Sequence, residues 1–273
     1  MPSPSEAVLE IREIAKTYNS GKTAHRALES ISFDVHHGEI VCVVGPSGCG
    51  KTTLLKCISG LAEPTSGSAR INGEAVVEPP AALGFVFQDY SRSLFSWMSV
   101  RGNVEFPLRG KVTRREARRR SDRALKAVGL EKFSQHKPFQ LSGGMQQRVA
   151  IARALAYEPE VMLMDEPFAS VDAQTRAELE DLVRSMRDEF DMTILFITHD
   201  IDEAVYLADK VVVLTPSPTQ VREVVAVNLG RARDQISTKE EELFVQLRGH
   251  VYRSVKNRWD PHELLSDPFK ARA

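Results

Sequence analysis

The sequence predicts an α/β fold in which helices cover a largely parallel β-sheet. Short apolar runs alternate with longer segments of helical periodicity, as expected when each crossover between parallel strands runs through a helix. A glycine-rich stretch, GPSGCGKT, lies between one of these apolar runs and a helical segment. The first forty residues differ, because they contain two stretches that look like antiparallel strands.

Each expected element follows from a local pattern. Residues 7–18 and 29–39 predict the antiparallel strands, which end at a turn around Gly38. Continuous runs rich in Val, Ile and Phe predict buried strands at 40–45, 84–87, 161–165, 193–197 and 211–214. Helical patterns lie near 51–59, 113–128, 145–156, 174–189 and 200–208. After a Pro/Ser turn at 215–219, we expect a strand at 221–227 and an amphipathic helix at 237–255.

Composition narrows the class of protein. Lys and Arg number 36 against 37 Asp and Glu in 273 residues, and this balance argues against nucleic-acid binding by bulk electrostatics. Cys42, Cys49 and Cys57 lack paired spacing, so they indicate neither a disulfide framework nor a zinc site. The N-terminus does not resemble a signal peptide, and no segment approaches the length of a membrane span.

GPSGCGKT fits the phosphate-loop pattern G-x-x-x-x-G-K-[ST], and its strand-then-helix context is the expected one. Its glycines let backbone N–H groups form an anion-binding nest at a helix N-terminus. Lys51 is expected to neutralise the β- and γ-phosphates, and the Thr52 hydroxyl to coordinate Mg²⁺. The candidate nucleotide-binding residues are Gly45, Pro46, Ser47, Gly48, Cys49, Gly50, Lys51, Thr52 and Thr53. Kinases, GTPases, helicases and transport ATPases share this loop.

Polar residues follow three of the buried strands. In VMLMDEP, Asp165 is a candidate to hold Mg²⁺ through its water shell, and Glu166 to polarise a water for attack on the γ-phosphate. A solvated strand end is the alternative for such a pair, and a structural role is the alternative for His199 in FITHD. Gln88 in VFQDY carries both a donor and an acceptor, which suits a residue that contacts metal and water together.

LSGGMQQ, residues 141–147, puts two glycines directly before a helix. A glycine costs a helix interior about 1 kcal/mol relative to alanine, so this pair needs another explanation. Ser142, Gly143 and Gly144 would leave bare backbone at a helix N-terminus, which favours a phosphate. Because one phosphate loop already surrounds one ATP, this second anion site would serve the ATP held by another copy.

These motifs, in the order GPSGCGKT, Gln88, LSGGMQQ, VMLMDE, ASVD and His199, resemble an ATP-binding cassette (ABC) ATPase over most of residues 8–228. The resemblance implies a P-loop NTPase fold with a mixed sheet, an N-terminal antiparallel β region and a helical signature-motif subdomain. The implied ABC ATPase domain spans 7–228, with the helical subdomain at about 89–158, and a helical tail follows at 229–273. It also implies two ATP molecules bound between paired copies of the chain.

Roles carried over from the resemblance are specific to residues. Tyr18 matches the aromatic residue that stacks on adenine, and Gln88 the residue that couples the metal site to a membrane subunit. Glu166 corresponds to the general base and His199 to the residue that holds the γ-phosphate geometry. Asp172 corresponds to a residue that crosses the dimer interface. Together with the residues described above, the candidate Mg²⁺ ligands are Thr52, Gln88 and Asp165.

The sequence also indicates a class of transporter. One cassette without a span implies docking on separate integral membrane permease subunits, as in bacterial importers, at the cytoplasmic face of the inner membrane. An exporter whose cassette is a separate chain is the alternative. A periplasmic or lipid-anchored solute-binding protein would then be an indirect partner, and no nucleic acid would be involved. The loop from Gln88 to Leu108 and the tail from Gly230 resemble nitrate, sulfonate and taurine importer ATPases.

A second hypothesis is a non-transport ABC ATPase that acts as an ATP-dependent dimerisation switch or regulatory module. Such a module predicts the loss of the base or of the histidine, yet Glu166 and His199 are both present. A soluble P-loop kinase would leave LSGGMQQ without a role.

Overall fold

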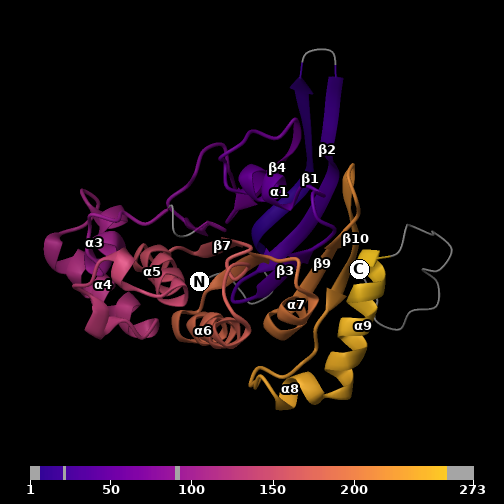
Figure 1. Ribbon diagram of the computed structural model, residues 1–273. Coiled ribbons are helices and arrows are strands. Elements are labelled where there is room, and N and C mark those ends of the chain that lie inside the picture. The colour runs from indigo at the N-terminus through magenta and orange to yellow at the C-terminus, as the bar shows by residue number, and fades with distance from the viewer. Residues whose placement is uncertain (1–6, 21–22, 90–92, 257–273) are drawn as a thin grey trace. The chain divides into compact units, whose positions relative to one another are not determined.

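The computed structural model describes residues 7–20, 23–89 and 93–256, and the chain divides into two compact units (Figure 1). Unit 1 consists of Met1–Pro80 and Thr193–Ala273, and unit 2 of Ala81–Met192. Part of the loop singled out above, residues 90–92, and the end of the expected tail, residues 257–273, lie outside the described residues.

A mixed sheet forms the centre of unit 1, with its strands in the order β5-β4-β1-β2-β10-β9-β3-β8. Strands β1 (Ala7–Ser20) and β2 (Thr23–His36) are the predicted antiparallel pair, and the following turn has Gly38 at φ 71°. Strands β4 (Ser66–Ile71) and β5 (Glu74–Ala75) extend the sheet beyond β1. The sequence analysis did not anticipate these two short, mostly exposed strands.

The parallel part of unit 1 has β3 (Ile40–Val44) between β8 (Thr193–Ile197) and β9 (Lys210–Leu214). Every residue of β3 and β8 is buried, which explains why both strands are continuous apolar runs. Strand β10 (Thr219–Ala226) runs antiparallel to β9 and pairs with β2 in parallel, so it connects the two parts of the sheet. The predicted mixed sheet is confirmed.

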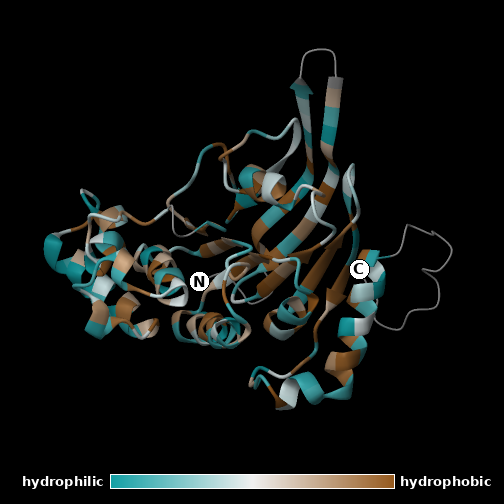
Figure 2. Ribbon diagram, viewed as in Figure 1, coloured by the Kyte–Doolittle hydropathy of each residue, from teal (hydrophilic) through white to brown (hydrophobic). Residues whose placement is uncertain are grey.

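Four described helices belong to unit 1: α1 (Lys51–Ile58), α7 (Ile201–Leu207), α8 (Ser237–Glu240) and α9 (Glu242–Lys256). Helix α9 lies alongside α7 and β9, with Phe244, Leu247 and Val251 buried (Figures 1 and 2). The single tail helix expected at 237–255 is in fact two helices. Glu241 has an extended backbone, with ψ 137°, and separates them.

Unit 2 contains the parallel strands β6 (Leu83–Val86) and β7 (Val161–Asp165). Its longer helices are α4 (Arg114–Ala127), α5 (Gly143–Ala156) and α6 (Ala173–Phe190), and the shorter α3 (Val100–Glu105) packs on α5. Single 3₁₀ turns lie at Phe106–Leu108, Glu131–Phe133 and Pro138–Gln140. Helix α5 begins two residues earlier than predicted, so both glycines of LSGG lie inside its first turn.

None of the described helices combines the length and the hydropathy that a bilayer crossing requires.

Candidate functional site

The phosphate loop of unit 1 joins the buried strand β3 to helix α1, as its sequence predicts. Gly48 and Gly50 have φ of 74° and 101°, in the left-handed region where a side chain is strained. Gly50 is the N-cap of α1, and a Cβ there would lie 3.1 Å from Leu28 Cδ2. The exposed part of the loop, Ser47 and Gly48, therefore presents its backbone next to a helix N-terminus.

Lys51 reaches back over the loop that precedes it. Its ammonium donates to the carbonyl oxygens of Gly45 at 3.1 Å and Pro46 at 3.3 Å, and the residue is only 6% exposed. A buried ammonium group at this position is suited to bind phosphate oxygens. Thr52 is exposed in the first turn of α1.

Thr219 supports this loop from a distant part of the chain, and the sequence analysis did not identify it. It lies at the start of β10 and is fully buried, and its hydroxyl donates to the Cys49 carbonyl. This bond ties the centre of the phosphate loop to a strand that follows it by about 170 residues. No local pattern marks Thr219, because its partner comes from the pairing of distant strands.

His199 lies at the same sheet edge as the phosphate loop. Strands β3 and β8 are parallel, and the N–H of Thr198 donates to the Val43 carbonyl at 3.2 Å. Both strands end at this edge. Strand β3 leads into the phosphate loop, and β8 leads to His199, which is exposed. Tyr18 lies near the end of β1 with 43% of its surface exposed, and the Lys16 ammonium is 5.4 Å from its ring centre.

Gln88, Asp165 and Glu166 come together at one edge of unit 2. Strands β6 and β7 are parallel with Val86 opposite Met164, so these three residues follow at the same ends of neighbouring strands. Asp165 is 5% exposed, whereas Gln88 is exposed. Glu166 has φ 41°, an uncommon backbone conformation for a residue with a side chain, and such strain is often found at functional sites.

The N-termini of α5 and α6 meet in unit 2. Ser142 caps α5 by accepting from the Met145 N–H at 3.3 Å, and no acidic residue occupies the first turn of that helix. Ser142 and Gly143 are exposed, so this helix end is open to an anion. Gly144 has a different environment, because a Cβ there would lie 2.4 Å from Thr175 Cγ2 on α6.

Asp172 caps α6 by accepting from the Thr175 N–H at 3.0 Å and from the Thr175 hydroxyl at 2.7 Å. The backbone bond from Thr175 is the main cause that lowers the pKa of the Asp172 carboxyl. This residue therefore has a structural function, in addition to any function at an interface.

Each unit offers oxygen donors of the kind that Mg²⁺ binds. Thr52 offers a hydroxyl in unit 1, and Gln88 and Asp165 offer amide and carboxylate oxygens in unit 2. Mg²⁺ prefers a few such oxygens together with water and phosphate oxygens. Among the residues that the structure describes, no group of three or more His, Cys, Asp or Glu is arranged to hold a metal ion.

Comparisons with known proteins find relatives that match most of the chain. A family model described as ABC transporter matches residues 28–169. The chain is 41% identical to the nitrate import ATP-binding protein NrtD of Synechococcus elongatus, over 86% of each chain. It is 39% identical to the bicarbonate transport ATP-binding protein CmpD of Synechocystis, over 93% of this chain and 90% of that one.

Among solved structures, the chain is similar to a dimeric, post-hydrolysis state of the ATP-binding cassette MJ0796 bound to ADP and Pi. The TM-score is 0.70 at 33% identity, and the match covers 81% of this chain and all of that one.

Proposed function

The chain belongs to the ABC transporter family of ATP-binding proteins and is an ATPase, and we propose that it drives the uptake of a small anion through separate membrane subunits. Relatives named for nitrate and bicarbonate support this class of solute. A relative named for aliphatic sulfonates supports the sulfonate and taurine type that the sequence resembles. These solutes share a negatively charged group with several oxygen atoms.

In this proposal the phosphate loop of unit 1 binds the triphosphate of ATP. Backbone N–H groups around Gly48 and the ammonium of Lys51 would contact the phosphate oxygens, with Ser47, Cys49 and Thr53 as their neighbours in the loop. Tyr18 would stack on the adenine, and its half-exposed ring suits that role. His199 would hold the γ-phosphate from the exit of β8.

Unit 2 would supply the hydrolytic residues. A carboxylate oxygen of Glu166 would accept a proton from the attacking water, and the strained backbone at this residue supports a functional role. Asp165, Gln88 and the Thr52 hydroxyl would hold Mg²⁺, which supplies charge neutralisation on the phosphate oxygens when bound. Support for these assignments comes from the residue types at each strand or helix end.

A second copy of the chain is the expected partner for α5. The observation that carries this proposal is the open N-terminus of α5, a 14-residue helix with exposed Ser142 and Gly143 and no acidic residue in its first turn. The γ-phosphate of an ATP bound to the partner copy would bind there, and Asp172 would lie at the same interface. MJ0796, the related cassette, is itself a dimer.

The test uses Glu166→Gln, which should keep the dimer closed because ATP binds without being hydrolysed. With ATP, this variant should elute as a dimer in light-scattering chromatography. Adding Gly143→Asp puts a carboxylate where the γ-phosphate would bind, so the double variant should stay monomeric and still bind fluorescent ATP. Val77→Asp is the matched control, because Val77 is 84% exposed. An ATP-dependent dimer of the Gly143→Asp double variant would refute the proposed interface.

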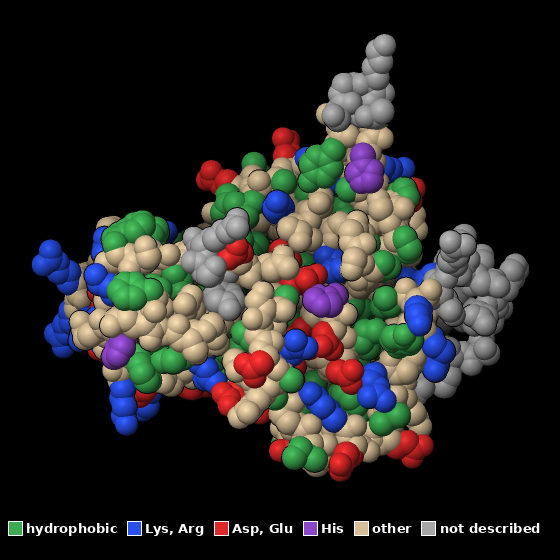
Figure 3. Space-filling model, in the orientation of Figure 1, with side chains coloured by type: hydrophobic (Ala, Val, Ile, Leu, Met, Phe, Trp, Pro, Cys, Tyr) green, Lys and Arg blue, Asp and Glu red, His purple; other side chains and the backbone are tan. Residues whose placement is uncertain are grey.

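An aromatic surface on unit 2 supports docking on a permease. Phe95 lies 4.4 Å from Phe106 and 5.1 Å from Trp97 between ring centres, and Trp97 is 68% exposed. Figure 3 shows hydrophobic side chains next to basic ones over the region of α3 and α4. Such a patch is typical of a protein-binding surface. Docking there would place the chain at the cytoplasmic face of the membrane, with a solute-binding protein as an indirect partner.

A further inference from the structure

Helix α7 begins two residues after His199 and has only seven residues. Helices this short are unstable by themselves, so α7 depends on the segments that pack around it. Five of its residues are buried, and β3 and α9 both pack against it. The position of His199 therefore depends on what holds α7.

Arg233 caps the C-terminal end of α7. Its guanidinium donates to the carbonyl oxygens of Tyr206 at 2.6 Å and Val205 at 3.3 Å, two of the last four carbonyls of the helix. The same side chain donates to Gly230 at 3.0 Å and Leu229 at 3.4 Å in its own segment. A positive charge at a helix C-terminus is also favourable toward the helix dipole.

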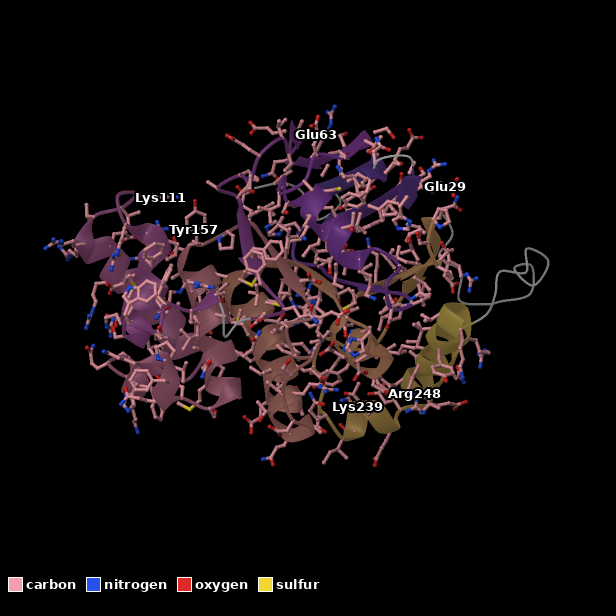
Figure 4. The ribbon with its side chains drawn as sticks, turned by 45° about the horizontal axis from the view of Figure 1, so that its top comes forward. Glu29, Glu63, Lys111, Tyr157, Lys239 and Arg248 are labelled. Carbon is pink, nitrogen blue, oxygen red and sulfur yellow. The ribbon has the colours of Figure 1, made fainter. Side chains whose placement is uncertain are left out.

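Two more cations of the same segment contact α7. The Lys239 ammonium lies 4.8 Å from the centre of the Tyr206 ring, which is fully buried. Arg248 on α9 lies 3.4 Å from Asp202 in the first turn of α7, in an exposed pair that contributes little alone. Figure 4 shows Lys239 and Arg248 on the gold C-terminal segment.

The C-terminal segment is itself fixed to the sheet. His250 Nε2 on α9 lies 3.0 Å from Glu223 Oε2 on β10, and the side chains are 7% and 11% exposed. Arg222, the neighbour of Glu223, donates to the Ser254 carbonyl. Residues 229–256 thus form a brace, here called the C-terminal brace, that is joined to β10 and contacts α7 at both ends.

Residues 198–200 connect this fixed helix to the fixed strand β8. The Asp200 N–H donates to the Thr198 hydroxyl at 2.9 Å, and the Asp200 carboxylate accepts from the Glu203 N–H at 3.2 Å as the N-cap of α7. Thr198 is 2% exposed and bonded to β3, whereas His199 between them is exposed. A shift of α7 would therefore move Asp200, and His199 with it.

We propose that the C-terminal brace is a positioning element for His199, with Arg233 as its principal positioning residue. The brace is also joined to β10, whose Thr219 donates to the Cys49 carbonyl of the phosphate loop. Arg233 donates to α7 itself, so a change of Arg233 tests the route to His199 through α7. This inference rests on the role proposed for His199, and it adds a function for the segment that follows the sheet.

The test compares Arg233→Ala with Arg253→Ala, a matched arginine in the exposed last turn of α9, in the full-length chain. Hydrogen exchange should become at least about tenfold faster across residues 199–208 in Arg233→Ala and stay unchanged across 40–58, because only α7 loses its cap. The kcat for ATP should fall about tenfold with KM within about twofold, whereas Arg253→Ala should behave as the parent. Arg233→Lys keeps the positive charge but not the planar guanidinium, so its kcat should fall less than that of Arg233→Ala. It replaces Arg233→Ala in these measurements if Arg233→Ala does not fold.

A double-mutant cycle separates positioning from general stability. In the His199→Ala background, adding Arg233→Ala should leave kcat within about twofold, since the residue it positions is gone. An equal drop in both backgrounds, or unchanged exchange across 199–208, overturns the inference. If instead His199→Ala keeps the parent kcat, the proposed role of His199 is wrong, and the positioning inference falls with it.

Discussion

Gly144→Ala is expected to destabilise the chain, although alanine is the better helix former. The new Cβ would lie 2.4 Å from Thr175 Cγ2, well inside van der Waals contact. Thr175 cannot turn away freely, because it is β-branched and its hydroxyl and N–H are both bonded to Asp172. The first turns of α5 and α6 would have to move apart.

The magnitude follows from two opposing effects. Overpacking of this kind costs about 1–3 kcal/mol, and the gain in helix propensity returns about 1 kcal/mol. We therefore expect a net loss of about 1 kcal/mol in the free energy of unfolding. Gly249→Ala on α9 is the matched control, because its Cβ would lie 3.4 Å from the flexible end of Arg253. That variant should gain about 1 kcal/mol.

Thermal unfolding of the nucleotide-free full chain measures both variants. At about 2–4 °C per kcal/mol for a chain of this size, their Tm values should differ by about 4–8 °C. Adding Thr175→Ser removes the clashing methyl group and keeps the hydroxyl for Asp172, so the double variant should recover most of the loss. If Gly144→Ala stabilises the chain as Gly249→Ala does, or if Thr175→Ser restores nothing, the close approach of the two helices is not the cause.

Three further outcomes are expected. Lys51→Ala should abolish binding of a fluorescent ATP analogue, whereas Lys56→Ala, which removes an exposed lysine of the same helix, should bind normally; equal binding by both would contradict the phosphate-loop assignment. Thr219→Val should weaken ATP binding several-fold, because the buried Cys49 carbonyl loses its donor, and an unchanged Kd would show that the loop holds its shape without that bond. Asp172→Asn keeps a capping side chain without the charge. The folded-state pKa of Asp172 is lowered from 3.8, so its contribution is present above that pH and is lost as the pH falls through the folded value. The stability gap between Asp172→Asn and the parent should therefore shrink below about pH 3.8 in urea unfolding, and a gap that is constant from pH 7 to pH 2 would contradict this cause.

The sequence predicted the buried parallel strands with little error, because their Val- and Ile-rich runs are bounded by clear turns. Strands β7 and β8 match residues 161–165 and 193–197 at both ends. The short strands β4 and β5 escaped prediction because half-exposed strands of this kind carry no apolar run. The predicted start of α5 was wrong by two residues, since glycine propensity argues against a helical first turn that the Ser142 cap stabilises.

The candidate site residues lie in local sequence motifs, whereas the residues that support them do not. The phosphate loop and the strand-end residues Asp165 and Glu166 lie within contiguous patterns. Thr219 and Arg233 act on residues that are distant in sequence, through one hydroxyl and one guanidinium, and such contacts leave no periodic or spaced signal.

Ser142 and Asp172 show why simple truncation would mislead at this site. Each is a candidate ligand or interface residue and is also the N-cap of a helix, so an alanine there removes a cap worth about 1 kcal/mol as well as any contact with ATP. Ser142→Thr and Asp172→Asn retain a capping oxygen, although Asp172→Asn also loses the charge that stabilises the cap near neutral pH. A loss of ATP-dependent dimerisation in these two variants, with Tm lowered less than in the alanine variants, would therefore locate the partner's nucleotide at these helix ends. A loss that appears only in the alanine variants, together with a lowered Tm, would assign both residues to folding alone.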